Sequence, residues 1–258
     1  MPARIHPMAV VDPAAEIGEN VDIGPGCVIG PRVRIGPGTR LRSHVTVDGC
    51  TRVGAGCEIF PFASLGHRSQ DLKFRGGCPR TEIGERTVIR EYVTVHAATA
   101  DGAVTRVGDD CLLMAYAHVA HDCEVGDGCI LGNAGMLGGH VCLEARSILG
   151  GLTGVHQFVR IGTQAMIGAC SKVTQDVPPY MLADGHPCRV WGINRVGLTR
   201  RGVPEATRRS LTRAFRLLYR KGLSRGQALE AIDRESAAVP ELARLAAFVR
   251  ASNRGLTG

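Results

Sequence analysis

Residues 125–150 read VGDGCILGNAGMLGGHVCLEARSILG, and in this stretch every sixth residue is a branched aliphatic. The same column of isoleucine, valine and leucine runs in one phase from Ile5 to Val173, and of its 29 positions only Asp71, Gly77 and Asp101 break it. An α-helix repeats every 3.6 residues and an ordinary strand every two, so neither produces a strict period of six. Repetition at a fixed period predicts a solenoid.

Each six-residue unit has the composition of one short strand and one turn. Glycine often follows the column residue, where it permits a tight corner, and a small or β-branched residue four positions after the column fills a second interior slot. Three units make a triangular coil of 18 residues, and coils stacked at about 4.8 Å form a prism on the order of 45 Å long. We therefore predict a mainly β fold, a parallel β-helix of hexapeptide repeats whose neighbouring coils complete each other's core.

The column is interrupted twice, over residues 66–82 and 100–106, and the first of these stretches is polar and glycine-rich. Long loops that leave a rigid solenoid commonly carry function. We expect both stretches to be loops ejected from the prism.

The repeat is expected to end at residues 176–179, because consecutive prolines cannot continue a buried ladder. This divides the chain into a β-helix over residues 1–180 and a connector with a helical domain over residues 181–258. Three amphipathic stretches in the second part predict a small C-terminal α-helical bundle, packed on or beside the prism.

Local signals mark where these helices begin. Pro204 suits the first position of one helix, and Pro240 opens another. Ser224 followed by Gln227 resembles a capping box, which predicts the start of a third helix between them.

The chain carries a net charge of +7, from 28 arginines and three lysines against 24 acidic residues. The excess lies late, over residues 200–221, and a basic face indicates an acidic partner. With 4% aromatic residues and no recognition motif, nucleic acid is not favoured. An anionic carrier protein or a nucleotide diphosphate fits the charge, and a solvated helix face is the alternative. No apolar run suits a membrane span or a signal peptide.

Half of the ten cysteines occupy the small interior slot of a hexapeptide, namely Cys27, Cys57, Cys111, Cys123 and Cys129. In such a slot cysteine acts as a small hydrophobe, and no C-x-x-C pair occurs. We predict reduced, structural thiols, which is consistent with the cytoplasm.

The 18-residue coil places His121, Gly139 and Gln157 in one column, with His140 and His156 beside it. These residues should converge on one patch within roughly 10 Å. An imidazole suits general-base work near neutral pH, and a glycine N–H beside it can donate to an oxyanion. Isolated surface histidines are the alternative interpretation.

Asp122 follows His121 and could orient its imidazole, as a carboxylate does in catalytic triads. Since adjacent residues of a strand face opposite ways, this pairing requires a corner at residues 121–122.

Five motifs in combination resemble the UDP-N-acetylglucosamine acyltransferase family, and the resemblance covers the whole chain. They are Gln70-Asp71-Leu72-Lys73, His118-Val-Ala-His121-Asp122-Cys123, Val155-His156-Gln157-Phe158, Gln175-Asp176-Val177-Pro178-Pro179-Tyr180 and Gly197-Leu198-Thr199-Arg200-Arg201-Gly202. The resemblance implies a left-handed β-helix and a homotrimer with clefts between neighbouring prisms. It implies transfer of an (R)-3-hydroxyacyl chain from acyl carrier protein to the 3-hydroxyl of UDP-N-acetylglucosamine, the first step of lipid A biosynthesis. The donor is the 4'-phosphopantetheine thioester, and no further cofactor is expected.

The resemblance also implies roles for single residues. His121 matches the general base with Asp122 beside it, and Gly139 matches the backbone N–H that holds the thioester oxyanion. Residues that match substrate contacts are Asp71 and Lys73 at the sugar, Asn194, Arg200 and Arg201 at the nucleotide, and His118, His140, His156 and Gln157 elsewhere.

Three positions concern specificity. Val196 stands where many members carry glutamate, and Ala97 where many carry arginine, so we expect nucleotide and substrate contacts to differ. Ala169 matches the position that often limits acyl length, where glycine permits longer chains. We predict a modest restriction on chain length.

Alternatives remain open. An acyltransferase for a 3-amino sugar nucleotide would use the same base, and no residue decides between hydroxyl and amine acceptors. The N-acyltransferase that acts later in lipid A synthesis usually has an extra N-terminal domain, whereas this repeat starts at Ile5. Metal-dependent hydratases of this fold have two histidines five residues apart, whereas His118 and His121 are three apart, so no metal is expected. A non-catalytic scaffold is the last alternative.

Overall fold

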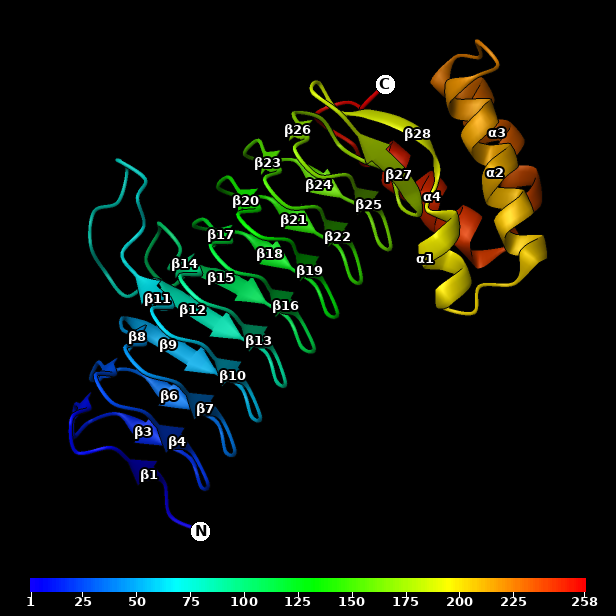
Figure 1. The fold of residues 1–258 in the computed structure, drawn as a ribbon. Coiled ribbons are helices and arrows are strands. Elements are labelled where there is room, and N and C mark those ends of the chain that lie inside the picture. Colours follow the sequence, from blue (N-terminus) through cyan, green and yellow to red (C-terminus); the bar gives the residue numbers. More distant parts are fainter.

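The computed structural model describes all 258 residues. A three-sided prism of stacked coils begins at the N-terminus, and helices cover its far end (Figure 1). Each coil contributes one short strand to each of three sheets, here named A, B and C, and every pairing inside the prism is parallel. The predicted parallel β-helix of hexapeptide repeats is confirmed.

Most strands are two residues long, and those of one sheet recur once per coil. Sheet A contains β1 (Arg4–Ile5), β4 (Asp22–Ile23), β7 (Arg40–Leu41), β10 (Glu58–Ile59), β13 (Val88–Ile89), β16 (Leu112–Leu113), β19 (Ile130–Leu131), β22 (Ile148–Leu149), β25 (Met166–Ile167), β27 (Met181–Asp184) and β28 (Arg189–Ile193). Sheet B contains β2 (Val10–Val11), β5 (Val28–Ile29), β8 (Thr46–Val47), β11 (Ser64–His67), β14 (Thr94–His96), β17 (His118–Val119), β20 (Met136–Leu137), β23 (Gly154–Val155) and β26 (Lys172–Val173). Sheet C contains β3 (Glu16–Ile17), β6 (Arg34–Ile35), β9 (Cys50–Val53), β12 (Arg80–Ile83), β15 (Val104–Val107), β18 (Glu124–Val125), β21 (Cys142–Leu143) and β24 (Arg160–Ile161).

The column residues form the core, because each strand carries one of them pointing into the prism. Leu113, Leu131, Leu137 and Leu149 are completely or almost completely buried, as are the column residues of all coils after the first, whereas Ile5 in the first coil is exposed. Fully burying one such side chain contributes about 1.5–3 kcal/mol relative to leaving it exposed. The stack of coils is therefore held together mainly by the six-residue column.

The register shows how the two interruptions are accommodated. Paired strands are normally 18 residues apart, as in Met136 and Gly154. Ile59 pairs with Ile89 and Ile89 with Leu113, separations of 30 and 24 residues, so twelve and six extra residues leave the coil. The insertions lie between β11 and β12 and between β14 and β15.

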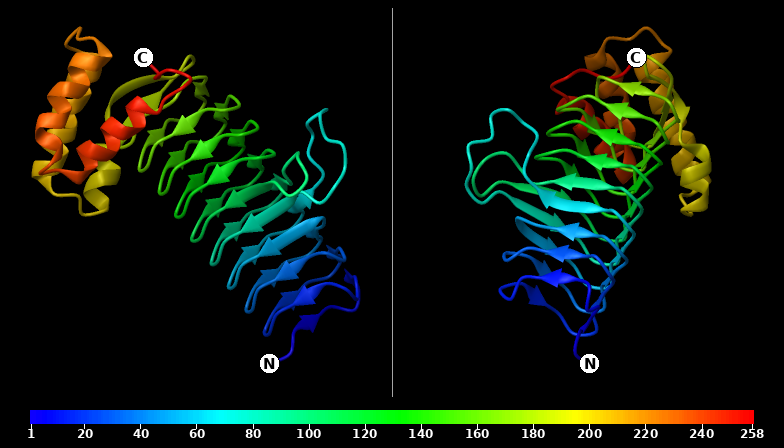
Figure 2. Two further views of the ribbon diagram at one scale, coloured as in Figure 1. Left: turned by 180° about the vertical axis from the view of Figure 1, so that it is seen from behind. Right: turned by 60° about the vertical axis from the view of Figure 1, so that its left-hand side comes forward.

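Both insertions leave the prism at the same edge, where sheet B passes into sheet C, and they lie side by side (Figures 1 and 2). We call this the B–C edge. The loops cover residues 68–79 and 97–103, not 66–82 and 100–106 as expected from the sequence. Their bounds shift because the flanking strands extend by backbone pairing, for example between Arg80 and Val104.

The five cysteines predicted to fill interior slots are buried and free, as expected. The prediction of reduced thiols is wrong for one other pair, since Cys50 and Cys78 form a disulfide. Cys50 belongs to β9 and Cys78 to the first inserted loop, which returns past β9. The period could not reveal this contact, because the inserted loop is outside the 18-residue register.

The region after the prolines is more regular than the predicted connector. β27 pairs in parallel with β25, so sheet A continues for one strand beyond Pro178 and Pro179, and β28 folds back antiparallel to β27. A short helix, α1 (Arg195–Arg200), follows.

Three longer helices complete the chain: α2 (Glu205–Tyr219), α3 (Arg225–Ser236) and α4 (Pro240–Arg250). The capping box of Ser224 and Gln227 is confirmed, and Pro240 lies in the first turn of α4. Pro204 is the N-cap of α2 instead of its first residue. Helix α4 contacts the prism, where the Arg160 guanidinium lies 4.5 Å from the centre of the Phe248 ring. No helix combines the length and the apolar character that crossing a membrane requires.

Candidate active site

The predicted corner at residues 121–122 exists. In the coil that follows the two loops, the chain turns at the B–C edge between β17 and β18. Asp122 has a φ of 59°, a left-handed conformation that Asp adopts more readily than most residues. Its N–H donates to Thr105 Oγ1 at 2.8 Å, and Thr105 is completely buried. Because of this corner, the side chains of His121 and Asp122 point to the same side of the backbone and can contact each other.

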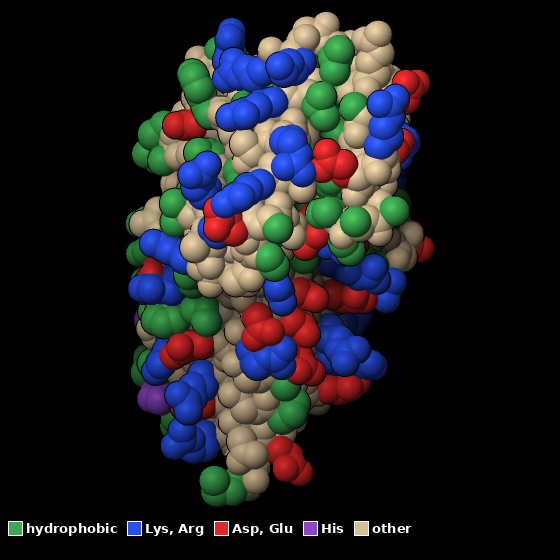
Figure 3. Space-filling model, turned by 90° about the vertical axis from the view of Figure 1, so that its right-hand side faces the viewer, with side chains coloured by type: hydrophobic (Ala, Val, Ile, Leu, Met, Phe, Trp, Pro, Cys, Tyr) green, Lys and Arg blue, Asp and Glu red, His purple; other side chains and the backbone are tan.

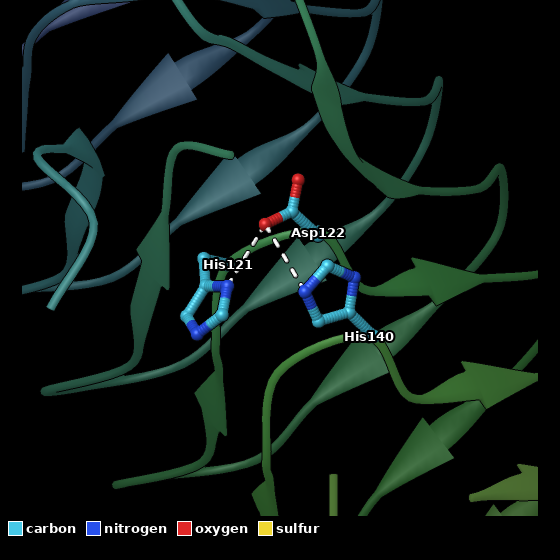
Figure 4. A group of neighbouring side chains, drawn as sticks. All are labelled: His121, Asp122 and His140. Carbon is cyan, nitrogen blue, oxygen red and sulfur yellow. Dashed lines mark hydrogen bonds and ion pairs between the residues drawn. The ribbon is translucent and has the colours of Figure 1, made fainter. Parts of the chain in front are cut away.

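His121 and Asp122 form a close pair with His140 beside them (Figure 4). His121 Nδ1 lies 2.8 Å from Asp122 Oδ2, and both side chains are only 14% exposed. His140 Nε2 lies 3.7 Å from the same oxygen. A carboxylate accepting from Nδ1–H selects the tautomer in which Nε2 is free to accept a proton.

Gly139 lies against the His121 ring, one coil further along. A Cβ at position 139 would be 2.5 Å from His121 Nε2, so only glycine fits without moving the imidazole. The Gly139 N–H donates no hydrogen bond, whereas the next N–H, that of His140, donates to the His121 carbonyl at 3.1 Å. A free donor therefore lies beside the free imidazole nitrogen.

Two further histidines of sheet B lie near this pair and are held neutral. His118 Nδ1 lies 2.7 Å from Thr94 Oγ1, and its ring packs edge-on against His96. Burial, followed by the positive charges that His96 and His121 can carry, lowers the pKa of His118 to about 4. The pKa of His96 is also lowered, mainly by burial and further by the positive charges that His67 and His121 can carry. Near pH 7 both rings can form hydrogen bonds without carrying charge.

These residues border a groove of about 830 Å³. The first inserted loop forms one wall, and the outer face of sheet B and the B–C edge form the rest. Six of the predicted site residues line it: Asp71, Lys73, His118, His121, His156 and Gln157. The structure thus brings the loop and the histidine column together.

Sequence reasoning missed several residues of this groove. Met136, Gly154 and Lys172 follow His118 at intervals of 18 residues, and all line the groove. The coil period could have found them, had it been applied to His118 as well as to His121. Arg254 does not line the groove, but its guanidinium lies 3.4 Å from Nδ1 of the lining residue His156; no sequence signal predicts this contact, because Arg254 comes from the C-terminal tail.

Three predicted residues, Asp122, Gly139 and His140, lie on the B–C edge beside the groove without lining it, and four others lie elsewhere in the chain. Asn194 caps α1, with Oδ1 accepting from the Gly197 N–H at 3.1 Å and Nδ2 donating to the Gln164 carbonyl at 3.0 Å. Arg201 donates to the Arg146 carbonyl at 3.3 Å. Gln164 and Arg146 are turn residues between sheets C and A, so this is a different edge of the prism.

Arg200 ends the same helix, α1. Ala169 is exposed in a turn between β25 of sheet A and β26 of sheet B. The prediction that these residues contact substrate can therefore hold only if a second copy of the chain, or a long substrate, connects the edges.

A second and larger groove of about 980 Å³ follows the outer face of sheet C. Charged side chains line it and pair with each other across neighbouring coils, as Glu16 does with Arg34 and Glu82 with Arg106. None of the predicted site residues reaches it. Several of its charges are already paired, and no predicted site residue lines it, so we assign the site to the smaller groove.

The cluster of His121, Asp122 and His140 could also hold a metal ion, since one ligand atom from each lies within 4.8 Å of the others. In the structure, Asp122 Oδ2 already accepts from His121 Nδ1. That the protein needs no metal stays a prediction.

Comparison with known proteins identifies the family of the chain. The family model for domain 2 of UDP-N-acetylglucosamine O-acyltransferase matches residues 176–257, and the bacterial transferase hexapeptide model matches residues 14–49 and 105–139. The structure of LpxA from Acinetobacter baumannii is 43% identical, with a TM-score of 0.95 over 98% of this chain and 99% of that one.

Two further solved structures are similar over nearly the full length. The UDP-N-acetylglucosamine acyltransferase of Bacteroides fragilis is 38% identical, with a TM-score of 0.96 over 98% of this chain and 100% of that one. The enzyme of Francisella novicida is 37% identical, with a TM-score of 0.95 over 98% and 93%. The chain therefore belongs to the UDP-N-acetylglucosamine acyltransferase family.

Proposed function

We propose that this protein transfers an (R)-3-hydroxyacyl chain from acyl carrier protein to the 3-hydroxyl of UDP-N-acetylglucosamine, the first step of lipid A biosynthesis. One observation carries the mechanism: the His121 imidazole, bonded through Nδ1 to Asp122, lines the groove and packs against Gly139, whose N–H makes no hydrogen bond within the chain. A general base and an oxyanion donor are the two groups that acyl transfer to a hydroxyl needs.

The reaction then proceeds in two stages. His121 Nε2 takes the proton of the sugar 3-hydroxyl while the oxygen attacks the thioester carbonyl, and the Gly139 N–H stabilises the negative charge on the carbonyl oxygen. The tetrahedral intermediate collapses, the C–S bond breaks, and the imidazolium returns its proton to the leaving thiolate. Asp122 keeps the imidazole in the required tautomer and stabilises its charged form.

The wall opposite His121 suits the sugar. Asp71 and Lys73 lie in the first inserted loop and line the same groove, and Asp71 Oδ1 accepts from the Lys73 N–H at 2.9 Å. The neutral imidazole of His118 can bond to sugar hydroxyls without competing with His121 for a proton.

A second copy of the chain would bring the nucleotide contacts to the groove. Arg200 and Arg201 suit the diphosphate, but they lie at an edge formed by sheets C and A. We propose a homotrimer in which these arginines and Asn194 complete the groove of a neighbouring subunit. Sedimentation measurements test this, and a monomer at concentrations where the enzyme is active would contradict it.

The helical domain suits an acidic carrier protein. Lys and Arg side chains spread over the upper part of the face shown in Figure 3, where the helices lie. On α2 and just beyond it, Arg216, Arg220 and Lys221 form no ion pair within the chain. An acidic docking surface would satisfy them.

Three smaller proposals follow from the same function. We expect no cofactor apart from the thioester donor, and stoichiometric zinc in the purified enzyme would contradict this. We place the reaction in the cytoplasm, although the disulfide of Cys50 and Cys78 is unusual there. Ala169 is proposed to restrict acyl length, and an unchanged preference in Ala169→Gly would remove that role.

The deciding experiment is mass spectrometry of products from a matrix of acyl carrier protein thioesters and acceptor sugars. We expect an ester on UDP-N-acetylglucosamine, and a loss of about 10²–10⁴-fold in His121→Ala, the usual contribution of a general base. His44→Ala, a substitution on another edge of the prism, should keep its activity. Equal rates for wild type and His121→Ala would contradict the mechanism, and product only with a 3-amino sugar would replace the acceptor.

A further inference from the structure

The two inserted loops are hydrogen-bonded to each other and, through one residue, to the His121–Asp122 pair, here called the dyad. Ser69 Oγ of the first loop lies 2.8 Å from Thr99 Oγ1 of the second. The Thr99 N–H donates to Asp122 Oδ2 at 3.2 Å, the same oxygen that His121 Nδ1 contacts at 2.8 Å. A continuous path therefore runs from the first loop to the imidazole.

The other end of this path is the part of the first loop that is proposed to bind the sugar through Asp71 and Lys73. Ser69 Oγ also accepts from the Asp71 N–H at 3.1 Å, and Asp71 in turn accepts from the Lys73 N–H. Ser69 is only 4% exposed, although it belongs to a loop that leaves the prism. A buried hydroxyl that is shared between two loops is expensive to leave unpaired, so each loop holds the other in place.

We propose that Ser69 and Thr99 are positioning residues that couple the loop carrying Asp71 and Lys73 to the His121–Asp122 pair. The inference rests on the proposed function of that pair. When the first loop is in place, the Ser69–Thr99 contact holds the Thr99 N–H on Asp122, and Asp122 holds the imidazole ready to accept a proton. When the contact is lost, the carboxylate loses one of its donors and the freedom of the imidazole increases.

The geometry of the edge explains why these residues meet. Residues 69, 99 and 122 occupy the B–C edge in three successive coils. A second link joins the loops further out, where the Cys78 N–H donates to Asp101 Oδ1 at 2.7 Å. The loops thus form one unit beside the dyad, and Thr99 is its point of contact with Asp122.

Kinetics of Thr99→Val, Ser69→Ala and the double variant test the coupling. A positioning role predicts that each single change lowers kcat by about 10-fold with KM little changed, because the interaction matters when the proton moves. The double variant should be no worse than either single one, since both remove the same contact; independent effects would multiply to about 100-fold. Thr99→Ser keeps the hydroxyl and should restore kcat to within about two-fold.

Thr87→Val is the matched control for a lost buried hydroxyl. Thr87 is completely buried and donates to the Gly108 carbonyl at 2.8 Å, on another edge of the prism. It should lower stability with kcat unchanged. Wild-type kcat in Thr99→Val, multiplicative effects in the double variant, or an equal kcat loss in Thr87→Val would each overturn the proposal.

Hydrogen–deuterium exchange separates this proposal from the proposed function, because it needs no turnover. Ser69→Ala should speed exchange in residues 97–103, and Thr99→Val should speed it in residues 68–79, since coupling is reciprocal. If Thr99→Val does not fold, Ser69→Ala and Thr99→Ser carry the test. If faster exchange is confined to the loop that carries the substitution, the proposed coupling is wrong. If exchange rises in both loops but the protein has no acyltransferase activity, only the proposed function is wrong.

Discussion

Two edges of the same prism use the same turn for different purposes. At the edge between sheets A and B, the left-handed turn residues of four successive coils are His44, Phe62, Tyr92 and Tyr116, and their rings stack at 4.9–5.2 Å. At the B–C edge, the left-handed turn residues are Asp122, His140 and Phe158. One edge carries an unbroken aromatic stack and the other the candidate active site.

Backbone conformation does not explain this difference, because the turns at both edges are left-handed. The two inserted loops explain the difference, since both leave the prism at the B–C edge. They add a wall and hydrogen-bond donors beside Asp122 that a bare corner lacks. A rigid repeat provides many equivalent corners, and a corner that inserted loops cover can become a binding or catalytic site.

The largest contrast should come from the equivalent glycines of the two edges. In Gly139→Ala the new methyl would displace His121, and a misplacement of about 1 Å can cost about 100-fold in rate. Gly151 holds the same turn position at the A–B edge, where a Cβ would lie 3.1 Å from the Asn133 carbonyl oxygen. Gly151→Ala should keep kcat within about two-fold.

Steady-state kinetics of both alanine variants, normalised to folded protein, make this comparison. Similar losses in the two variants would mean that glycine serves coil packing alone and that the contact with His121 is incidental.

A smaller difference is expected between His118 and His44 in how they affect the pH dependence of the free energy of unfolding. The pKa of His118 is lowered from 6.5 to about 4 in the folded state, so below pH 6.5 the unfolded chain binds a proton that the folded protein does not. Its contribution to stability is complete above pH 6.5 and declines as the pH falls towards 4. At pH 5 the loss should be about 2 kcal/mol.

Urea unfolding at pH 7 and pH 5 measures this difference. His118→Gln should flatten the pH dependence, whereas the same change at exposed His44, on the A–B edge, should leave it as in wild type. A His118→Gln protein that loses as much stability as wild type would show that His118 is not responsible.

The smallest effect is expected at the aromatic stack. Tyr92 stacks on Phe62 and Tyr116, so Tyr92→Ala should lower the free energy of unfolding by about 1–2 kcal/mol, and Tyr92→Phe by much less. Activity per folded molecule should stay within about two-fold for both. A large loss of activity with little loss of stability would mean that the A–B edge also serves the site.

The six-residue column predicted much of this from sequence, because in a coil of fixed length a separation along the chain becomes a position in space. It placed His121, Gly139 and Gln157 together and required the corner at Asp122. The same reasoning failed where residues leave the register. The disulfide of Cys50 and Cys78 was missed because one partner is in an inserted loop. The contact of Asn194 with substrate, which the family resemblance implies, stays a prediction; within the chain this residue caps α1.

The sequence by itself determined the prism, its interior and the column of catalytic candidates, since strict periodicity leaves the chain one way to bury its aliphatic side chains. Only the tertiary structure decided what surrounds that column. The contact of Ser69 with Thr99 joins residues of two different insertions, and Arg254 reaches His156 from the far end of the chain. Such contacts depend on where loops and tail come to rest, which is set by hydrogen bonds between segments that share no period.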